Sequence, residues 1–257
     1  MLTIMERFDL EDRVAVVTGA SSGLGRRAAE VLHAAGASVV VVARREGRLD
    51  QLCEALGSRC LAVPADVTDP AVSDRIVAAT LAQFGRVDLL VNVAGVADED
   101  TAFREGEDRF AWVIDVNLTS VFVLSTRVAA AMRERGDGGV IVNVASILGM
   151  LASPEVPGAG YAASKGGLIN LTRELASQWQ RYGIRVNALA PGFFASEMTQ
   201  ELLAEGSQSR RRLEERTLLG RIGELHELDG PLLLLASEAS SYMTGQVLTV
   251  DGGWTAI

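Results

Sequence analysis

The stretch Val14-Ala-Val-Val-Thr-Gly-Ala-Ser-Ser-Gly-Leu-Gly25 decides the fold of this chain. Its first five residues are apolar or β-branched and too few for a helix, which is typical of a buried strand, and glycines and a helical pattern follow. Glycine lets the backbone turn tightly and approach a ligand, while the next helix presents free N–H groups and the positive end of its dipole. The stretch therefore predicts an anion site that suits a pyrophosphate.

Two alternatives compete for the same residues. A glycine turn between a strand and a helix also occurs for packing alone. In addition, Gly19-Ala-Ser-Ser-Gly23 matches the G-x-S-x-G nucleophile elbow of the α/β-hydrolases. That family needs several strands before the elbow and an acid and a histidine after it, whereas Val14 lies near the start of the chain and only His226 lies usefully downstream. The hydrolase interpretation is therefore disfavoured.

Length and charge limit the function classes. The chain has 257 residues, 48% of them hydrophobic, and no proline- or serine-rich linker, which predicts a single domain over residues 1–257. A net charge of −9 disfavours unaided binding to nucleic acid or an anionic membrane, because both depend on a positive surface. The longest aliphatic block, residues 232–236, is too short to span a bilayer.

Cysteine and histidine usage points to a cytoplasmic enzyme without a metal. Cys53 and Cys60 lack C-x-x-C spacing, so free buried thiols in a reducing compartment are expected. His33 and His226 are too few and too separated for a metal cage. The first ten residues contain no apolar signal core, which argues against export.

Apolar strand-like segments alternate with helix-like segments along the chain. Strands are expected at 14–18, 38–43, 60–64, 88–93, 140–145, 185–189 and 246–250, and helices at 24–35, 46–56, 71–84, 107–132, 161–182 and 224–236. Strands without polar alternation, separated by helices, are typical of a parallel sheet covered on both faces. The predicted fold is α/β, a single doubly wound parallel (Rossmann) sheet of about seven strands, with its ligand at the carboxyl ends of the strands.

Polar residues follow those strand ends. Arg44 and Arg45 end the second strand about twenty residues after the glycine turn, where a dinucleotide site meets the adenosine ribose. An acid there would bind the 2′-hydroxyl of NAD, whereas two guanidiniums suit a 2′-phosphate and favour NADP; a solvated helix start is the alternative. Asp66 could accept from an adenine amino group or cap a turn, and Asn92-Val-Ala-Gly95 supplies small residues where a backbone must pass close to a ligand.

The only lysine of the chain, Lys165, lies four residues after Tyr161, one of three tyrosines. At i and i+4 on a helix the two side chains share a face, and an ammonium near a phenol favours the phenolate and lowers its pKa from about 10 towards neutrality. Tyr161 would then serve as general acid and base, with an inconsequential exposed pair as the alternative. Ser146, at the end of the fifth strand, could hold a substrate carbonyl or simply form a turn.

These motifs together resemble the short-chain dehydrogenase/reductases across nearly the whole chain. The matching motifs, in order, are Thr18-Gly-Ala-Ser-Ser-Gly-Leu-Gly25, Asp66-Val67, Asn92-Val-Ala-Gly95, Asn117, Ser146, Tyr161-Ala-Ala-Ser-Lys165, Pro191-Gly192, Thr244-Gly-Gln246 and Val250-Asp-Gly-Gly253. The resemblance implies that Tyr161 exchanges a proton with the carbonyl or alcohol oxygen, that Ser146 orients this oxygen, and that Lys165 tunes Tyr161 and holds the nicotinamide ribose. It also implies that Asn117 completes a proton relay through water.

The cofactor-binding residues implied by the motifs and the resemblance are Gly19, Ser21, Ser22, Gly23, Leu24, Gly25, Arg44, Arg45, Asp66, Val67, Asn92, Ala94, Gly95, Tyr161, Lys165, Pro191, Gly192, Phe194 and Ser196. Two positions depart from the family pattern. Val93 replaces the second asparagine of Asn-Asn-Ala-Gly, and Ser22 stands where many NADP users carry a basic residue, which leaves Arg44 and Arg45 to bind the phosphate. The spacing from Ser146 to Tyr161 is slightly long; the added residues 154–157 should form one wall of the substrate pocket and a lid at 193–216 the other.

The resemblance implies an NADP(H)-dependent oxidoreductase that transfers a hydride between nicotinamide and a small ketone or secondary alcohol. Residues 191–199 look like those of members that act on sugar acids and small ketones. A 3-oxoacyl-(acyl carrier protein) reductase is an alternative, for which Arg173, Arg181 and the arginines at 210–212 are the available basic residues. An NADP-binding sensor is the non-enzyme alternative, which an intact Ser146, Tyr161 and Lys165 disfavours.

The family also suggests a homotetramer. Its interfaces should contain the two long helices and the tail at 242–257, because Trp254 and the apolar residues 256–257 would otherwise be exposed.

Overall fold

The computed structural model describes residues 3–97 and 100–256. The described part contains seven parallel strands in the order β3-β2-β1-β4-β5-β6-β7. The strands are β1 Val14–Thr18, β2 Ser38–Ala43, β3 Cys60–Pro64, β4 Leu89–Asn92, β5 Gly139–Val144, β6 Ile184–Pro191 and β7 Val247–Val250. The strand order reverses between β1 and β4, and in such a sheet the ligand site lies at that point. The predicted doubly wound α/β fold is confirmed.

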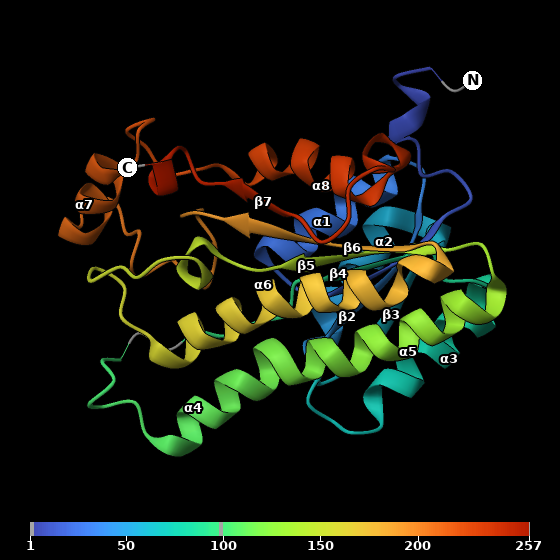
Figure 1. The fold of residues 1–257 in the computed structure, drawn as a ribbon, viewed down its shortest axis with the longest axis horizontal. Coiled ribbons are helices and arrows are strands. Elements are labelled where there is room, and N and C mark those ends of the chain that lie inside the picture. Colours follow the sequence, from blue (N-terminus) through green and yellow to red (C-terminus); the bar gives the residue numbers. More distant parts are fainter. Residues whose placement is uncertain (1–2, 98–99, 257) are drawn as a thin grey trace.

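Helices cover both faces of this sheet. The helices of the described residues are α1 Gly23–Ala34, α2 Glu46–Leu56, α3 Val72–Phe84, α4 Glu107–Ile114, α5 Ser120–Arg135, α6 Ala159–Trp179, α7 Gln208–Arg216 and α8 Asp229–Ala236, of which α7 lies apart from the sheet. Figure 1 shows α1 and α8 on one face and α5 and α6 on the other.

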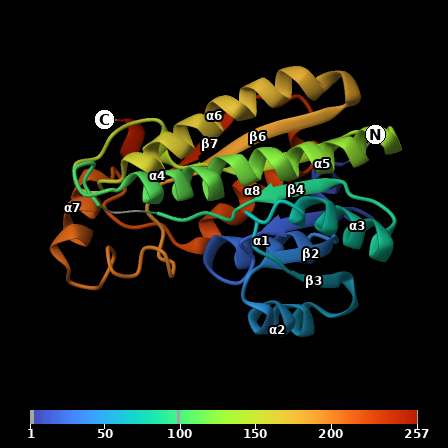
Figure 2. The ribbon, with the colours of Figure 1, turned by 90° about the horizontal axis from the view of Figure 1, so that it is seen from below.

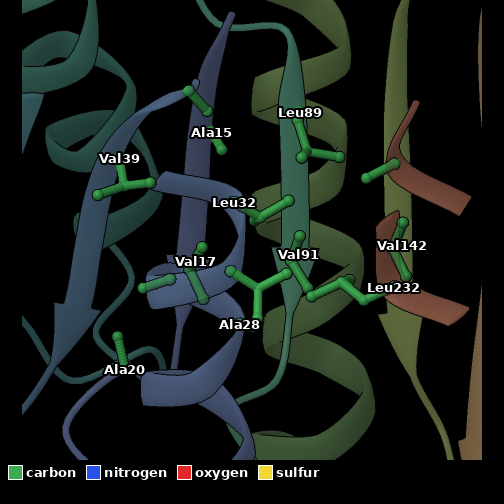
Figure 3. Packing of buried hydrophobic residues seen from close by; sticks show 14 of the residues in the cluster. Ala15, Val17, Ala20, Ala28, Leu32, Val39, Leu89, Val91, Val142 and Leu232 are labelled. Atoms are coloured by element: carbon green, nitrogen blue, oxygen red, sulfur yellow. The ribbon is translucent and has the colours of Figure 1, made fainter. Parts of the chain in front are cut away.

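The core has two layers, one on each side of the sheet. Every residue of β1 is buried, so this strand shows no polar alternation. Ala15 and Val17 face the layer formed with α1 and α8, whereas Val14 and Val16 face the layer formed with α5 and α6. Figure 3 shows Ala28 and Leu32 of α1, with Leu232 of α8, packed against the first of these faces.

The helix predicted at 107–132 is continuous but contains a π-helical turn, Asp115–Thr119, between α4 and α5. Figure 2 shows α4 and α5 as one long rod. By length and composition alone Glu107–Arg135 could cross a membrane, but half of its apolar window is buried inside the fold, as in the core helix of a globular protein.

The expectation of free thiols was wrong. Cys53 of α2 and Cys60 of β3 form a disulfide, with their Cα atoms 5.0 Å apart. Gly57 ends α2 with a φ of +79°, and the chain reverses there into β3, which brings the two cysteines together.

Trp254 corrects a second expectation, because this side chain is fully buried within the chain itself. Its ring meets Phe193 edge-on at 4.8 Å, and the Arg216 guanidinium lies 4.4 Å from it. Trp254 therefore does not call for a partner subunit, although Tyr242 in the same tail is fully exposed.

Candidate active site

The glycine turn after β1 closes tightly on the loop after β4. Gly19 has a φ of +69°, and a Cβ placed there would lie 2.9 Å from the backbone of Ala94. A Cβ at Gly25 would collide with the carbonyl oxygen of Gly19. The hydroxyl of Thr18 accepts hydrogen bonds from the N–H groups of Val93 (3.0 Å) and Ala94 (3.1 Å), which joins the two loops. The side chain of Ser22 does not cap α1, so the first N–H groups of the helix are available to an anion.

Two cavities lie at these strand ends and share Gly19, Ser22, Ala94 and Gly95. Of the residues predicted from sequence, the first cavity is lined by Gly19, Ser22, Gly23, Leu24, Gly25, Ala94, Gly95, Ser146, Tyr161, Lys165, Pro191, Gly192, Phe194 and Ser196. The second is lined by Gly19, Ser21, Ser22, Arg44, Arg45, Asp66, Val67, Ala94 and Gly95. An elongated ligand could therefore run from the end of β2 to Tyr161. A Cβ at Gly19 or Gly25 would collide with the backbone that shapes this turn, so only glycine keeps the turn open to a pyrophosphate and the residues present fit a dinucleotide.

Asn117 is buried behind these cavities and does not line them. It lies in the π-helical turn, where its Oδ1 accepts from Val96 N and its Nδ2 donates to Val96 O, both at 2.8 Å. The same Nδ2 donates to the Ser164 hydroxyl at 3.0 Å. Asn117 thus fixes the loop after β4 against α6, while its part in a water relay stays a prediction.

Asn92 is also buried, within a polar chain that the sequence analysis missed. Its Nδ2 donates to the Ser125 hydroxyl at 3.1 Å and to Asn143 Oδ1 at 2.9 Å. Asn143 in turn donates to the Thr172 hydroxyl at 2.9 Å. These bonds tie β4 and β5 to α5 and α6, the helix that carries Tyr161. Buried polar groups need such partners, and the scattered positions leave no signal in the sequence.

Ser146, Tyr161 and Lys165 all line the first cavity. The Ser146 hydroxyl accepts from Leu148 N at 3.1 Å just after β5. On α6, Lys165 Nζ donates to the carbonyl oxygen of Val144 at 2.8 Å and lies 5.6 Å from the centre of the Tyr161 ring. Helix α6 can approach the segment after β5 because residue 149 is glycine: a Cβ there would lie 2.7 Å from the N atom of Gly166 in α6.

Burial dominates the electrostatics of this pair. It raises the pKa of the Tyr161 phenol, although hydrogen bonding with the Ser146 side chain acts in the opposite direction. It also lowers the pKa of Lys165 from 10.5 to about 8. The expected lowering of the Tyr161 pKa was therefore wrong, because removal of the phenol from water outweighs the Ser146 hydrogen bond, and the Lys165 ammonium is bonded to Val144 O.

At the adenosine end the two arginines differ. Arg45 donates to the hydroxyls of Ser21 (2.9 Å) and Ser22 (2.7 Å), and its Nη1 lies 2.9 Å from the Glu197 carboxylate. Arg44 is exposed and lines the cavity.

Asp66 is exposed and accepts from the N–H of Thr68 at 3.0 Å and from its hydroxyl at 2.8 Å, so it forms the turn that was one of its two predicted roles. These hydrogen bonds from Thr68 lower the pKa of Asp66. The adenine contact stays a prediction.

A further cavity of ≈ 370 Å³ opens beside Ser146 and Tyr161. Val156 and Pro157 line it, as do Phe193, Met198 and Leu202, so residues from both predicted walls border this space. The arginines at 210–212 do not line it. Within residues 3–97 and 100–256, no group of three His, Cys, Asp or Glu side chains could hold a metal ion.

Comparison with known proteins agrees with this arrangement. The family model described as enoyl-(acyl carrier protein) reductase matches residues 19–255. The chain is 39% identical to the 2-dehydro-3-deoxy-D-gluconate 5-dehydrogenase of Dickeya dadantii, over 98% of this chain and 99% of that protein. It is 37% identical to the 3-oxoacyl-[acyl-carrier-protein] reductase of Salmonella typhimurium, over 95% of this chain and 97% of that protein.

The fold is equally similar to solved structures. A gluconate 5-dehydrogenase from Burkholderia cenocepacia, solved in complex with NADP and tartrate, superposes with a TM-score of 0.94 at 35% identity, over 99% of this chain and 100% of that one. The sheet order, the glycine turn and the convergence of Ser146, Tyr161 and Lys165 agree with these likenesses. The chain belongs to the short-chain dehydrogenase/reductase family and is an NAD(P)-dependent oxidoreductase.

Proposed function

We propose that the chain transfers a hydride between NADP(H) and a small ketone or secondary alcohol, with Tyr161 as general acid and base. The observation that carries this proposal is the convergence of Ser146, Tyr161 and Lys165 in the cavity that also contains the glycine turn. A reacting carbonyl carbon and the cofactor need to share one space, and this cavity offers it.

When bound, the nicotinamide supplies or accepts the hydride. In reduction, the Tyr161 hydroxyl gives its proton to the carbonyl oxygen, so that proton and hydride together convert C=O to CH–OH. The Ser146 hydroxyl donates a hydrogen bond to the same oxygen and holds it near Tyr161. The phenolate left behind is stabilised by the Lys165 ammonium, which remains largely protonated at pH 7 because its pKa is about 8. Asn117 completes the proposed route for the proton by which Tyr161 is restored.

NADP is proposed over NAD because Arg44 and Arg45 line the second cavity, where the adenosine would lie. The acidic residue that lines this cavity in the described part of the chain is the exposed Asp66. Two guanidiniums suit a 2′-phosphate. The Burkholderia gluconate 5-dehydrogenase, solved with NADP, supports the same choice.

The test is Tyr161→Phe, with Tyr182→Phe as its matched control. Tyr182 lies in a 3-10 turn at the end of α6 and lines neither cavity. Loss of the proton donor should lower kcat at least a hundredfold and leave the Kd for NADPH within about twofold, because the phenyl ring still packs. The control should keep both values. Normal turnover by Tyr161→Phe would show that the proton comes from elsewhere.

A 3-oxoacyl-[acyl-carrier-protein] reductase is the second candidate. The likeness to the Salmonella enzyme and an apolar wall near Tyr161, formed by Ile147, Leu148 and Phe193, favour it. A 3-oxoacyl thioester as substrate distinguishes it from a reductase of free ketones. A non-catalytic NADP-binding sensor predicts no turnover with any carbonyl compound.

We further propose a single domain over residues 1–257, with 193–216 as a lid, and a homotetramer in the cytoplasm. Phe110 and Phe122, which are 39% and 45% exposed on α4 and α5, support an interface along these helices. The Cys53–Cys60 disulfide removes the argument that free thiols gave for the cytoplasm. Light scattering at micromolar concentration tests the tetramer, and cell fractionation tests the location.

A further inference from the structure

The cavity beside Ser146 and Tyr161 has hydrocarbon walls. Its large apolar lining side chains are those of Ile147, Leu148, Leu151, Val156, Phe193, Met198 and Leu202. Apart from Ser146 and Tyr161, the polar side chains that line it in the described part of the chain are Thr101, Ser153 and Thr199, and no charged side chain does so.

Two of these three hydroxyls are already engaged. The Ser153 hydroxyl donates to Glu155 Oε2 at 2.7 Å. The Thr199 hydroxyl donates to the carbonyl oxygen of Phe194 at 2.7 Å. A polyhydroxylated ligand that left water for this cavity would therefore find few partners for its own hydroxyl groups.

Two arginines of the predicted lid, Arg216 and Arg210, do not line the cavity and are held by other partners. Arg216 lies over the buried ring of Trp254 and within 3.5 Å of the Glu155 carboxylate. Arg210 is paired with Glu214 at 2.8 Å. A carboxylate in the cavity would lose its water without gaining a positive partner, which is unfavourable by several kcal/mol.

We propose that the substrate is a ketone, or the matching secondary alcohol, whose reacting carbon carries an apolar aliphatic or aromatic body. This rests on the proposed function and separates the chain from its sugar-acid relatives. The same chemistry is present in a free ketone and in the acyl chain of a 3-oxoacyl thioester, and both enter the test.

The test compares kcat/KM for NADPH oxidation with butan-2-one, hexan-2-one, octan-2-one, 5-oxo-D-gluconate and a 3-oxohexanoyl thioester of N-acetylcysteamine. Each methylene that enters the cavity should raise kcat/KM about fourfold. The sugar acid should be at least tenfold poorer than hexan-2-one, since it would bury an unpaired carboxylate. Preference for the thioester over the ketones identifies the acyl source of the apolar body, and the reverse identifies a free ketone.

A variant that adds a positive charge to the cavity wall provides a second test, which does not depend on which substrate the parent protein prefers. Met198 lines the cavity and is 48% exposed, so Met198→Arg should fold and supply the missing positive partner. It should raise kcat/KM for 5-oxo-D-gluconate about fivefold and lower it for octan-2-one. Leu219→Arg is the control, because Leu219 is 66% exposed and lines neither cavity at Tyr161.

The outcomes separate the two proposals. Faster turnover of 5-oxo-D-gluconate than of every apolar carbonyl by the parent would overturn the apolar substrate and leave the proposed hydride transfer standing. No turnover of any carbonyl by a protein that binds NADPH would overturn the proposed function and the substrate class together.

A separate observation concerns Glu197, which crosses from the segment after β6 to the adenosine side. Its carboxylate lies 2.9 Å from Arg45 Nη1 and forms a second ion pair with Arg48. Hydrogen bonds from Arg48 and Arg45, in that order of effect, lower the pKa of Glu197 to about 2, so the carboxylate is ionised at neutral pH. Arg45 is therefore occupied by an anion of the protein itself.

We infer that Glu197 determines cofactor specificity by competing with the 2′-phosphate for Arg45 and Arg48. A phosphate that reaches Arg45 must displace this carboxylate or remain beside it, and either event weakens the binding of NADP(H) relative to NAD(H). Both groups accept charge-assisted hydrogen bonds from the same guanidinium and repel each other as like charges, so they compete for it.

Glu197→Gln tests this, with Glu201→Gln as a control on the same exposed segment. Calorimetric titration should show the Kd for NADPH falling about fivefold in Glu197→Gln and the Kd for NADH changing less than twofold, as expected from the loss of partly exposed ion pairs. The control should match the parent. An unchanged or higher Kd for NADPH, or an equal fall for both cofactors, would overturn the inference.

Discussion

Lys165 is a charge held in an apolar site, so its replacement by methionine should stabilise the fold and abolish activity. The residue is only 4% exposed, and burial lowers its pKa from 10.5 to about 8. That difference corresponds to about 3 kcal/mol against the folded state at pH 7. Methionine is similar in length and removes this penalty, but it loses the charge-assisted hydrogen bond to Val144 O, a loss of about 2 kcal/mol. The net expectation is about 1 kcal/mol of added stability.

The dependence on pH has a definite sign. Below about pH 8 Lys165 is protonated in both the folded and the unfolded chain, so the full penalty applies. Between about 8 and 10.5 the folded chain releases its proton first, and the stability of the parent rises with pH. Lys165→Met has no such proton, so its advantage over the parent should shrink from pH 7 to pH 9.5.

Urea unfolding without cofactor, at equal subunit concentration and at both pH values, measures these free energies. Turnover of the variant with NADPH should be undetectable because the phenolate of Tyr161 loses its cation. Lys165→Arg is the matched control: it retains a charge, so it should not gain stability, and its planar guanidinium cannot replace a compact ammonium, so its activity should remain low. A variant Lys165→Met no more stable than the parent at pH 7, or one whose advantage does not change with pH, would refute this reasoning.

Three further outcomes are expected. Arg44→Ala should raise the Kd for NADPH about tenfold and that for NADH hardly at all, as titration would show; equal effects would exclude a contact with the 2′-phosphate. Asp88→Asn should lower the free energy of unfolding in urea by about 3 kcal/mol, because the buried carboxylate accepts from Val14 N and pairs with arginines; a loss below about 1 kcal/mol would contradict this. Gly149→Ala should lower kcat while NADPH still binds, because a Cβ there would lie 2.7 Å from Gly166 N and displace the helix that carries the catalytic tyrosine; an unchanged kcat would argue against such coupling.

The fold could be predicted from the sequence because strands that are buried on both faces of a sheet appear as uninterrupted apolar runs. The strands Val14–Thr18, Ser38–Ala43 and Cys60–Pro64 and the helix Glu46–Leu56 begin and end where the sequence predicts. The helix expected to end at 132 continues to Arg135, since its last three residues are charged and carry no apolar periodicity.

Much of the candidate site could be predicted for another reason: glycines and polar residues at strand ends form an ordered series of motifs. The contacts that could not be predicted join residues far apart in the sequence. Arg45 and Arg48 meet Glu197 about 150 residues later, and surface charges carry no periodicity that would pair them. The predicted direction of the Tyr161 pKa shift was wrong because the i and i+4 spacing identifies a neighbour on the helix only. It shows neither how deeply the phenol is buried nor that the Lys165 ammonium donates to the Val144 carbonyl.

The substrate class cannot be inferred from overall sequence identity for a related reason. The motifs that carry the resemblance line the cavity of the glycine turn and Tyr161, and these are the positions that a shared cofactor and a shared proton transfer would preserve. The wall that would touch the rest of the substrate comes instead from the segments around Leu148, Val156 and Leu202, where a few side chains decide between hydrocarbon and counter-charge. Identity of 39% over nearly the full chain can therefore coexist with a different substrate. The variant Met198→Arg tests whether one positive side chain in this wall changes the preferred substrate from an apolar ketone to a sugar acid.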